Sequence, residues 1–252
     1  MKRFITLIYG ISCYALFFAT FLYAIGFVGN LIVPKSIDSV PTVSLSTALF
    51  INTLLLTVFA LQHSIMARPF FKRAWTKIVP EEAERSTYVL FSSLALILLF
   101  TLWEPMGGVI WDIDNTMARN ALHITYGFGW ALVLASTFAI DHFDLFGLRQ
   151  TWRFARGVDY EPPVFKQPIL YRIVRHPLYV GWIVVFWATP TMTIAHLFFA
   201  VVTTLYILIA IQLEEHDLKS AHPEYEEYKR RVPMLIPALG RLFRKPTAQP
   251  TN

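Results

Sequence analysis

Two polar segments near the C-terminus combine residue types that bind charged ligands. The first reads Arg175-His176-Pro177-Leu178-Tyr179-Val180-Gly181, and the second begins with Glu214-Glu215. Proline is favoured in the first turn of a helix, so Pro177 predicts a helix start whose free N–H groups and partial positive charge can hold a carboxylate. Gly181, one turn into this helix, permits the close approach of a ligand or of another helix.

Acidic and aromatic residues supply complementary groups. Glu214 and Glu215 end a long apolar run, and a negative charge at a helix C-terminus opposes the helix dipole, which favours a functional reason for both residues. Glu214 is suited to accept hydrogen bonds from the hydroxyl or amino groups of a ligand. Tyr225 and Tyr228 lie three residues apart on one helix face, where they can wall an aromatic ring or face a cation.

Long uncharged stretches must position these groups. Of the 252 residues, 55% are hydrophobic and 15% are charged, whereas a soluble domain has about 25% charged residues. The segment Leu178–Leu213 contains no Asp, Glu, Lys or Arg. As one straight helix it would be longer than a ~30 Å hydrocarbon core. A break is therefore predicted within Ala188–Thr191, where Pro190 interrupts the helix. We therefore predict an all-α polytopic membrane protein with about six transmembrane helices, the last two forming a tight hairpin. The first four spans are expected at 4–28, 46–67, 86–103 and 120–140.

The basic residues predict the orientation of these spans. With a cytoplasmic N-terminus, only Lys35 and Arg119 of the 22 Lys and Arg residues fall in outer segments, as the positive-inside rule requires. Both termini are then cytoplasmic, and the expected location is the inner membrane with the active site at its cytoplasmic face. The net charge of +5 is explained by this topology, so a nucleic-acid partner is not expected.

We expect one integral membrane domain over residues 1–252. Within it, 1–141 is predicted to form a four-span bundle, 142–240 a ligand-binding region with the helical hairpin, and 245–252 a disordered tail. The spacing of Cys, His, Asp and Glu predicts no metal site, and the sequence leaves the oligomeric state open.

This topology gathers further ionisable residues at the cytoplasmic end. His63 ends the second predicted span, Asp141 and His142 end the fourth, and Arg68 and Arg85 lie in the cytoplasmic segment between spans two and three. Ionisable groups near the bilayer are functional candidates. We expect His63 or His142 to accept a proton, with Asp141 orienting the imidazole, and Arg68 or Arg85 to stabilise an anion. An ordinary buried histidine explains His63 and His142 equally well.

The C-terminal motifs resemble the isoprenylcysteine carboxyl methyltransferase superfamily over about residues 167–237. The matching elements are Arg-His-Pro-x-Tyr-x-Gly, Glu-Glu-x-x-Leu and Glu-Tyr-x-x-Tyr-x-x-x-Val-Pro, in this order around an apolar hairpin. The resemblance implies that S-adenosylmethionine is the cofactor and that Glu214 lies beside the cofactor or the substrate. Ala210 stands where these enzymes are expected to carry an arginine for a substrate carboxylate, which argues against a carboxylate acceptor. The expected cofactor-binding residues are Tyr171, Arg175, His176, Pro177, Leu178, Tyr179, Gly181, Glu214, Glu215, Tyr225 and Tyr228.

The N-terminal half narrows this resemblance. Residues 61–69 and 80–88 look like the NnrU-like membrane proteins, and with 141–150 added the chain is most similar to the bacterial membrane methanethiol S-methyltransferases. That resemblance spans nearly the whole chain and implies conversion of methanethiol into dimethyl sulfide. Because free thiols titrate above neutrality, near ~8.5 for cysteine, His63, Asp141 and His142 are the expected catalytic residues and Arg68 and Arg85 the thiolate-stabilising residues.

Two alternatives stay open at this point. The same cofactor could serve another acceptor, such as a lipid amine or an isoprenylated thiol. A different class is a non-enzymatic, haem-binding or regulatory NnrU-like protein, in which His63 and His142 would ligate the iron. A transporter is disfavoured because the sequence has neither an inverted repeat nor charged residues at mid-span. His123 and His196 lie nearer to the outer side and are expected to be structural.

Overall fold

The computed structural model describes residues 1–237, and in these residues the chain is mainly helical. Five helices are long and apolar enough to cross a membrane, which confirms a polytopic helical protein. The shortest has 22 residues and extends for ~33 Å, slightly more than a ~30 Å hydrocarbon core. The tail predicted over 245–252 lies outside the described residues. The five helices are α1 (Lys2–Gly29), α2 (Leu45–Ala67), α4 (Glu81–Leu102), α5 (Thr116–Ile140) and α10 (Ile194–Ala221).

The predicted break between the last two apolar segments is present. The short helix α9 (Pro177–Trp187) ends at Ala188, and α10 begins at Ile194. Between them the chain forms strand β2 (Thr191–Thr193). The third long helix, α4, starts five residues earlier than the predicted third span. Glu81, Glu82 and Glu84 in its first turn interact favourably with the helix dipole, which explains the earlier start.

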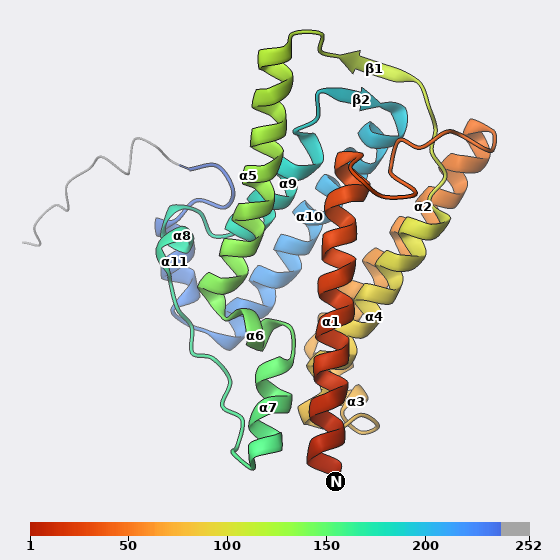
Figure 1. Ribbon diagram of the computed structural model, residues 1–252. Coiled ribbons are helices and arrows are strands. Elements are labelled where there is room, and N and C mark those ends of the chain that lie inside the picture. The colour runs from red at the N-terminus through yellow and green to blue at the C-terminus, as the bar shows by residue number, and fades with distance from the viewer. Residues whose placement is uncertain (238–252) are drawn as a thin grey trace, which may run out of the picture.

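A small antiparallel pair of strands departs from the all-α prediction. Strand β1 (Val109–Asp112) pairs with β2, with Val109 opposite Thr193 and Asp112 opposite Thr191. The pairing satisfies backbone groups of the α9–α10 turn that no helix can satisfy there. It also ties this turn to the connection between α4 and α5, at one end of the bundle (Figure 1).

The short helices are α3 (Pro69–Trp75), α6 (His142–Leu145), α7 (Leu148–Arg156), α8 (Ile169–Ile173) and α11 (Tyr225–Arg231). Of these, α3, α6 and α7 lie toward the end of the bundle opposite the strands, where the N-terminus also lies, and α8 and α11 lie beside α5, farther from the N-terminus (Figure 1). The short helices connect or extend the long ones. Loops and the two strands thus lie at one end of the bundle, and short polar helices lie toward the other. The latter end carries the sequence-predicted site residues.

Two glycines allow α5 and α9 to pack closely. A Cβ atom on Gly129 would lie 3.1 Å from the backbone oxygen of Gly181, and a Cβ on Gly181 would lie 2.9 Å from the backbone nitrogen of Val133. Small residues at such a crossing bring helix backbones together in a membrane. Of the two uses expected for Gly181, the structure therefore supports packing against a helix. This contact fixes the position of α9, and with it the start of the helix at Pro177.

Candidate active site

The start of α9 presents unpaired backbone donors beside His176. His176 is the N-cap residue with a non-helical backbone and makes no side-chain cap bond, and Pro177 occupies the first helical position. The N–H groups of Leu178 and Tyr179 therefore lie in the first turn, where a helix offers no acceptor of its own. His176 and Pro177 are buried, and Leu178 and Tyr179 are partly buried. This end of α9 has the predicted form of a carboxylate-binding helix start.

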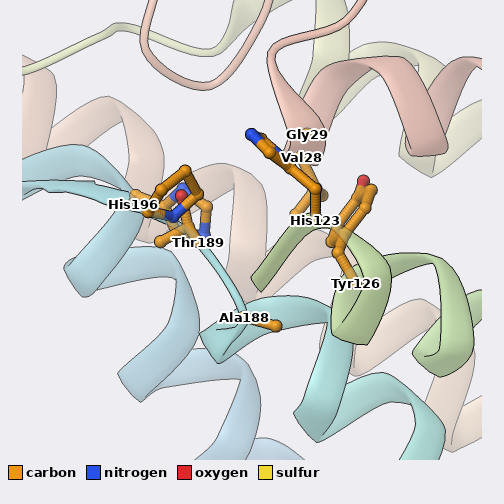
Figure 2. A pocket seen from close by; sticks show the side chains of 8 residues that line it. Val28, Gly29, His123, Tyr126, Ala188, Thr189 and His196 are labelled. Carbon is orange, nitrogen blue, oxygen red and sulfur yellow. The ribbon is translucent and has the colours of Figure 1, made fainter. Parts of the chain in front are cut away.

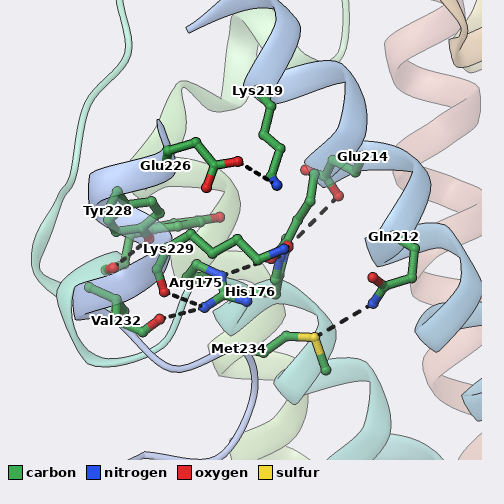
Figure 3. Close-up of polar contacts among 12 residues, drawn as sticks. Arg175, His176, Gln212, Glu214, Lys219, Glu226, Tyr228, Lys229, Val232 and Met234 are labelled. Atoms are coloured by element: carbon green, nitrogen blue, oxygen red, sulfur yellow. Dashed lines mark hydrogen bonds and ion pairs between the residues drawn. The ribbon is translucent and has the colours of Figure 1, made fainter. Parts of the chain in front are cut away.

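Glu215 is the centre of an ionic network that includes Arg175, His176 and Lys229, three residues that Figure 3 labels. Its Oε1 atom accepts hydrogen bonds from Arg175 Nε at 2.7 Å and His176 Nε2 at 3.1 Å, and its Oε2 atom lies 2.6 Å from Lys229 Nζ. Arg175 also donates to the backbone oxygens of Lys229 and Val232, at 3.1 and 2.5 Å. The network joins α9, α10 and α11, and the polar groups of Arg175 and Glu215 are engaged within the protein.

Glu214, the adjacent carboxylate, has a different environment. Its side chain is 42% exposed, and Tyr179 donates a hydrogen bond to its Oε2 atom at 3.0 Å. His176 Nδ1 lies 4.0 Å from the same oxygen. Among the residues that the structure describes, the Oε1 atom of Glu214 has no hydrogen-bond partner. Glu214 therefore keeps an oxygen available for a ligand next to the start of α9.

The two tyrosines of α11 pack in a small aromatic cluster with Phe165. Tyr228 donates from its hydroxyl to the backbone oxygen of Tyr171 at 2.6 Å, whereas the buried hydroxyl of Tyr225 has no partner among the described residues. Burial raises the pKa of Tyr171 and of Tyr225, and raises that of Tyr228 to about 12, so all three are neutral at pH 7. Tyr228 thus has an internal partner, and Tyr225 remains a free donor.

A second polar group lies at the same end, between α2 and α4. His63 of α2 stacks on Phe59, with ring centroids 5.3 Å apart, and its ring nitrogens lie within 3.2 Å of two hydroxyls of α4. Ser92 Oγ is 3.2 Å from Nδ1, and the Tyr88 hydroxyl is 3.1 Å from Nδ1 and 3.0 Å from Nε2. The described partners of His63 are thus side-chain hydroxyls of α4.

The two arginines predicted to stabilise an anion differ in their partners. Arg68 forms an ion pair with Asp217 of α10 at 2.8 Å. Arg85 lies 5.7 Å from the centroid of the Tyr88 ring, and no carboxylate among the described residues lies within ion-pair distance of it. Arg85 is therefore the better candidate for a transient anion.

Tyr206 of α10 connects the two polar groups. Its hydroxyl lies 2.9 Å from Ser64 Oγ on α2, and its ring meets that of Phe59 edge-on, with centroids 6.4 Å apart. Arg68, one turn after Ser64 at the end of α2, pairs at 2.8 Å with Asp217, which lies one turn after Glu214 on α10. The residues around Glu214 and those around His63 thus adjoin each other.

Asp141 and His142 lie in a third environment, against α1. Both ring nitrogens of His142 are 2.8 Å from hydroxyls, Nε2 from Tyr14 and Nδ1 from Thr137, and its ring stacks on a phenylalanine. Burial lowers the pKa of His142. Asp141 caps α6 and pairs with Arg149, and it orients neither histidine. None of the described contacts of Asp141 or His142 reaches His63 or Glu214.

Four residues of this end were absent from the sequence-based candidates: Tyr88, Ser92, Tyr206 and Lys229. Tyr88 and Ser92 are one helical turn apart on the same face of α4 as Arg85, a spacing that the sequence displays. The sequence could not show that this face of α4 contacts His63, because that contact depends on how α4 packs against α2. Tyr206 lies in an apolar run and gives no signal of its own.

A small pocket occurs at the opposite end of the bundle, near the α9–α10 turn (Figure 2). Its volume of about 10 Å³ is near the minimum for one water molecule, so it cannot hold a nucleotide. His196 beside it donates a hydrogen bond from Nε2 to the backbone oxygen of Phe186 at 3.0 Å. Although burial opposes ionisation of the nearby Asp38, hydrogen bonds from His196, Thr193 and Asn30 lower its pKa. His196 packs as the structural residue that was expected. The pocket is lined by Val28, Gly29, His123, Tyr126, Ala188, Thr189, Pro190 and His196.

The fold and the two adjoining polar groups define a multi-pass helical membrane protein with a site at one end of its bundle. The chain belongs to the methanethiol S-methyltransferase family. It is 55% identical over 242 residues to the methanethiol S-methyltransferase of Crocosphaera subtropica, covering 96% of this chain and 95% of that protein. It is 50% identical over 238 residues to the enzyme of the same name from Mycobacterium tuberculosis, covering 94% of this chain and 98% of that protein.

A more distant relative extends this comparison beyond bacteria. The chain is 30% identical over 223 residues to the Nurim homolog of Drosophila pseudoobscura, covering 79% of this chain and 88% of that protein. No family model and no solved structure matches the chain. The resemblance to methanethiol S-methyltransferases is thus confirmed by relatives that align along nearly the full chain.

Proposed function

We propose that this protein transfers a methyl group from S-adenosylmethionine to methanethiol and releases dimethyl sulfide. The observation that carries the proposal is the identity of 50–55% to methanethiol S-methyltransferases along more than nine-tenths of the chain. The matched region includes both polar groups, at Glu214 and at His63. Such an enzyme has to bring a water-soluble donor and a small apolar thiol together, and a site at the end of a membrane bundle suits both.

The residues near the start of α9 fit the polar parts of S-adenosylmethionine. The unpaired N–H groups of Leu178 and Tyr179 suit a carboxylate, and the half-exposed Glu214 suits an amino group or ribose hydroxyls. The hydroxyl of Tyr225, buried and without a partner among the described residues, is the orphaned donor that such a ligand would satisfy. Arg175 and Glu215 support this site by holding α9, α10 and α11 together.

On the acceptor side, His63 takes the thiol proton and Arg85 stabilises the thiolate. The bound donor supplies a methyl group on a positively charged sulfur, which is already electrophilic, so alignment and exclusion of water are the main tasks of the protein. Phe59 and Tyr206 form apolar walls beside His63, in keeping with a small thiol that arrives through the lipid. We propose a structural role for the other two candidates, because His142 contacts Tyr14 of α1 and Asp141 caps α6 and pairs with Arg149 of α7.

We also propose that α9 and α10 form the fifth and sixth spans, with both termini in the cytoplasm. The donor site then faces the cytoplasm, where S-adenosylmethionine is made. The support is the concentration of Lys and Arg in the segments at this end, with only Lys35 and Arg119 in the others.

The test is methyl transfer by the purified protein in detergent or vesicles. We expect dimethyl sulfide in the headspace when S-adenosylmethionine and methanethiol are both present, and binding of S-adenosylmethionine by calorimetry. Glu214→Gln should weaken donor binding, because an amide accepts hydrogen bonds less strongly than a carboxylate. Glu226→Gln, at an exposed pair with Lys219, is the matched control and should bind normally. Donor binding without any methylation of methanethiol, but with methylation of a lipid amine or isoprenylated thiol, would contradict the assigned acceptor.

A further inference from the structure

Tyr88 is the residue of α4 that lies closest to the His63 ring nitrogens. Its hydroxyl is 3.0 Å from Nε2, while Ser92, one turn further along α4, places Oγ 3.2 Å from Nδ1. No carboxylate of the described residues is within hydrogen-bond distance of His63. The Tyr88 hydroxyl lies 3.1 Å from Nδ1 as well, so it can donate to whichever ring nitrogen carries no proton. When Nδ1 carries the proton and donates it to Ser92, that acceptor is Nε2.

Tyr88 also lies beside Arg85, the residue proposed to stabilise the thiolate. The Arg85 guanidinium lies 5.7 Å from the centre of the Tyr88 ring, and the Arg68–Asp217 ion pair joins this part of the bundle to α10 beside Glu214. His63 itself is covered on one face by Phe59. A thiol held at Arg85 therefore lies beside Tyr88, and the Tyr88 hydroxyl is the described group nearest to the His63 ring nitrogens.

We infer that Tyr88 relays the thiol proton to His63, an inference that rests on the proposed function. The thiol S–H proton passes to the Tyr88 oxygen while the Tyr88 proton passes to Nε2 of His63. The thiolate sulfur then forms its bond to the methyl carbon, and the bond from that carbon to the donor sulfur breaks with its electron pair left on the donor. The proton on His63 leaves to solvent, so the products are dimethyl sulfide, S-adenosylhomocysteine and one proton. Tyr88 is then a residue for thiol activation, in addition to His63.

The experiment compares Tyr88→Phe with Tyr9→Phe as a function of pH. Tyr88→Phe keeps the ring that Arg85 contacts and removes only the hydroxyl. Tyr9→Phe also removes a single hydroxyl bound to α4, since Tyr9 of α1 pairs with Thr87 at 2.9 Å, but this contact lies between α1 and α4 and does not involve His63. We expect kcat/KM for methanethiol to fall about 10²-fold in Tyr88→Phe at neutral pH, as on loss of a general-base pathway. The loss should shrink as the pH approaches the pKa of the thiol, because the substrate then arrives ionised. Tyr9→Phe should follow the wild type at every pH.

Two further measurements separate the relay from a merely structural role. S-adenosylmethionine should bind Tyr88→Phe with wild-type affinity by calorimetry, and both variants should unfold at similar temperatures. If Tyr88→Phe does not fold, Ser92→Ala carries the test, with a smaller loss that also shrinks at high pH. A loss that is constant with pH, or no loss at all, would overturn the relay while leaving methyl transfer intact. A wild-type protein that does not methylate methanethiol would instead overturn the proposed function.

Discussion

At the scale of single residues, neighbouring carboxylates on one helix have separate tasks. Glu214 and Glu215 are consecutive in α10, so their side chains point about 100° apart around the helix axis. Glu215 is directed at Arg175, His176 and Lys229, and Glu214 at Tyr179. The sequence predicted that this pair lies beside His176, which is correct. It could not divide the roles, because that depends on the rotation of α10 relative to α9.

Replacing Glu215 tests its structural role. In Glu215→Gln the buried Arg175 and the partly exposed Lys229 lose their shared counter-charge, and breaking the buried Arg175–Glu215 pair in this way costs about 3–5 kcal/mol. We expect a clearly lower unfolding temperature. It can be measured on heating, either by the reaction of a thiol-specific dye with Cys13 when unfolding exposes it, or by loss of the helical circular-dichroism signal. Glu226→Gln, whose pair with Lys219 is exposed, should unfold like the wild type. Equal stability of the two variants would show that the Glu215 network does not hold the helices together.

At the scale of elements, the hydrophobic pattern predicted the spans well because length and apolar character are local properties. The break before Pro190 and the helix start at Pro177 were predicted for the same reason. The order of helices around the bundle is not local. His63 and His142 both end spans at the same end of the bundle, yet α2 packs against α4 and α10, whereas α6 follows α5 and packs near α1 and α7. Separating the two histidines therefore required the structure.

The close crossing of α5 and α9 yields a prediction at this scale. A methyl group on Gly181 would meet the backbone of Val133 at 2.9 Å, so Gly181→Ala forces the helices apart at a cost of about 1–3 kcal/mol. Because α9 carries the start of the donor site, we expect weaker S-adenosylmethionine binding by calorimetry together with a lower unfolding temperature. Gly127→Ala is the control, since a Cβ there has no neighbour within 4 Å. Normal donor binding in Gly181→Ala would mean that this crossing does not set the site geometry.

At the scale of the whole molecule, charge and chemistry are concentrated at one end. The loops that carry β1 and β2 form the other end, where Asp38, Thr193 and His196 make a buried polar contact. The pocket described near the α9–α10 turn has a volume of about 10 Å³, which is too small for a substrate. A bundle with this asymmetry is useful only in one orientation, because its donor is found on one side of the membrane.

Labelling of single cysteines tests that orientation. Cys13 is buried and is first replaced in Cys13→Ala to remove the native thiol. Val40→Cys then reports on the loop after α1, and Ile78→Cys on the loop before α4; these side chains are 83% and 78% exposed, at opposite ends of the bundle. With cytoplasmic termini, a membrane-impermeant maleimide should label Val40→Cys in intact spheroplasts and Ile78→Cys only after permeabilisation. The reverse pattern would place Glu214 and the start of α9 away from the cytoplasmic donor, and methyl transfer at this site could then not proceed as proposed.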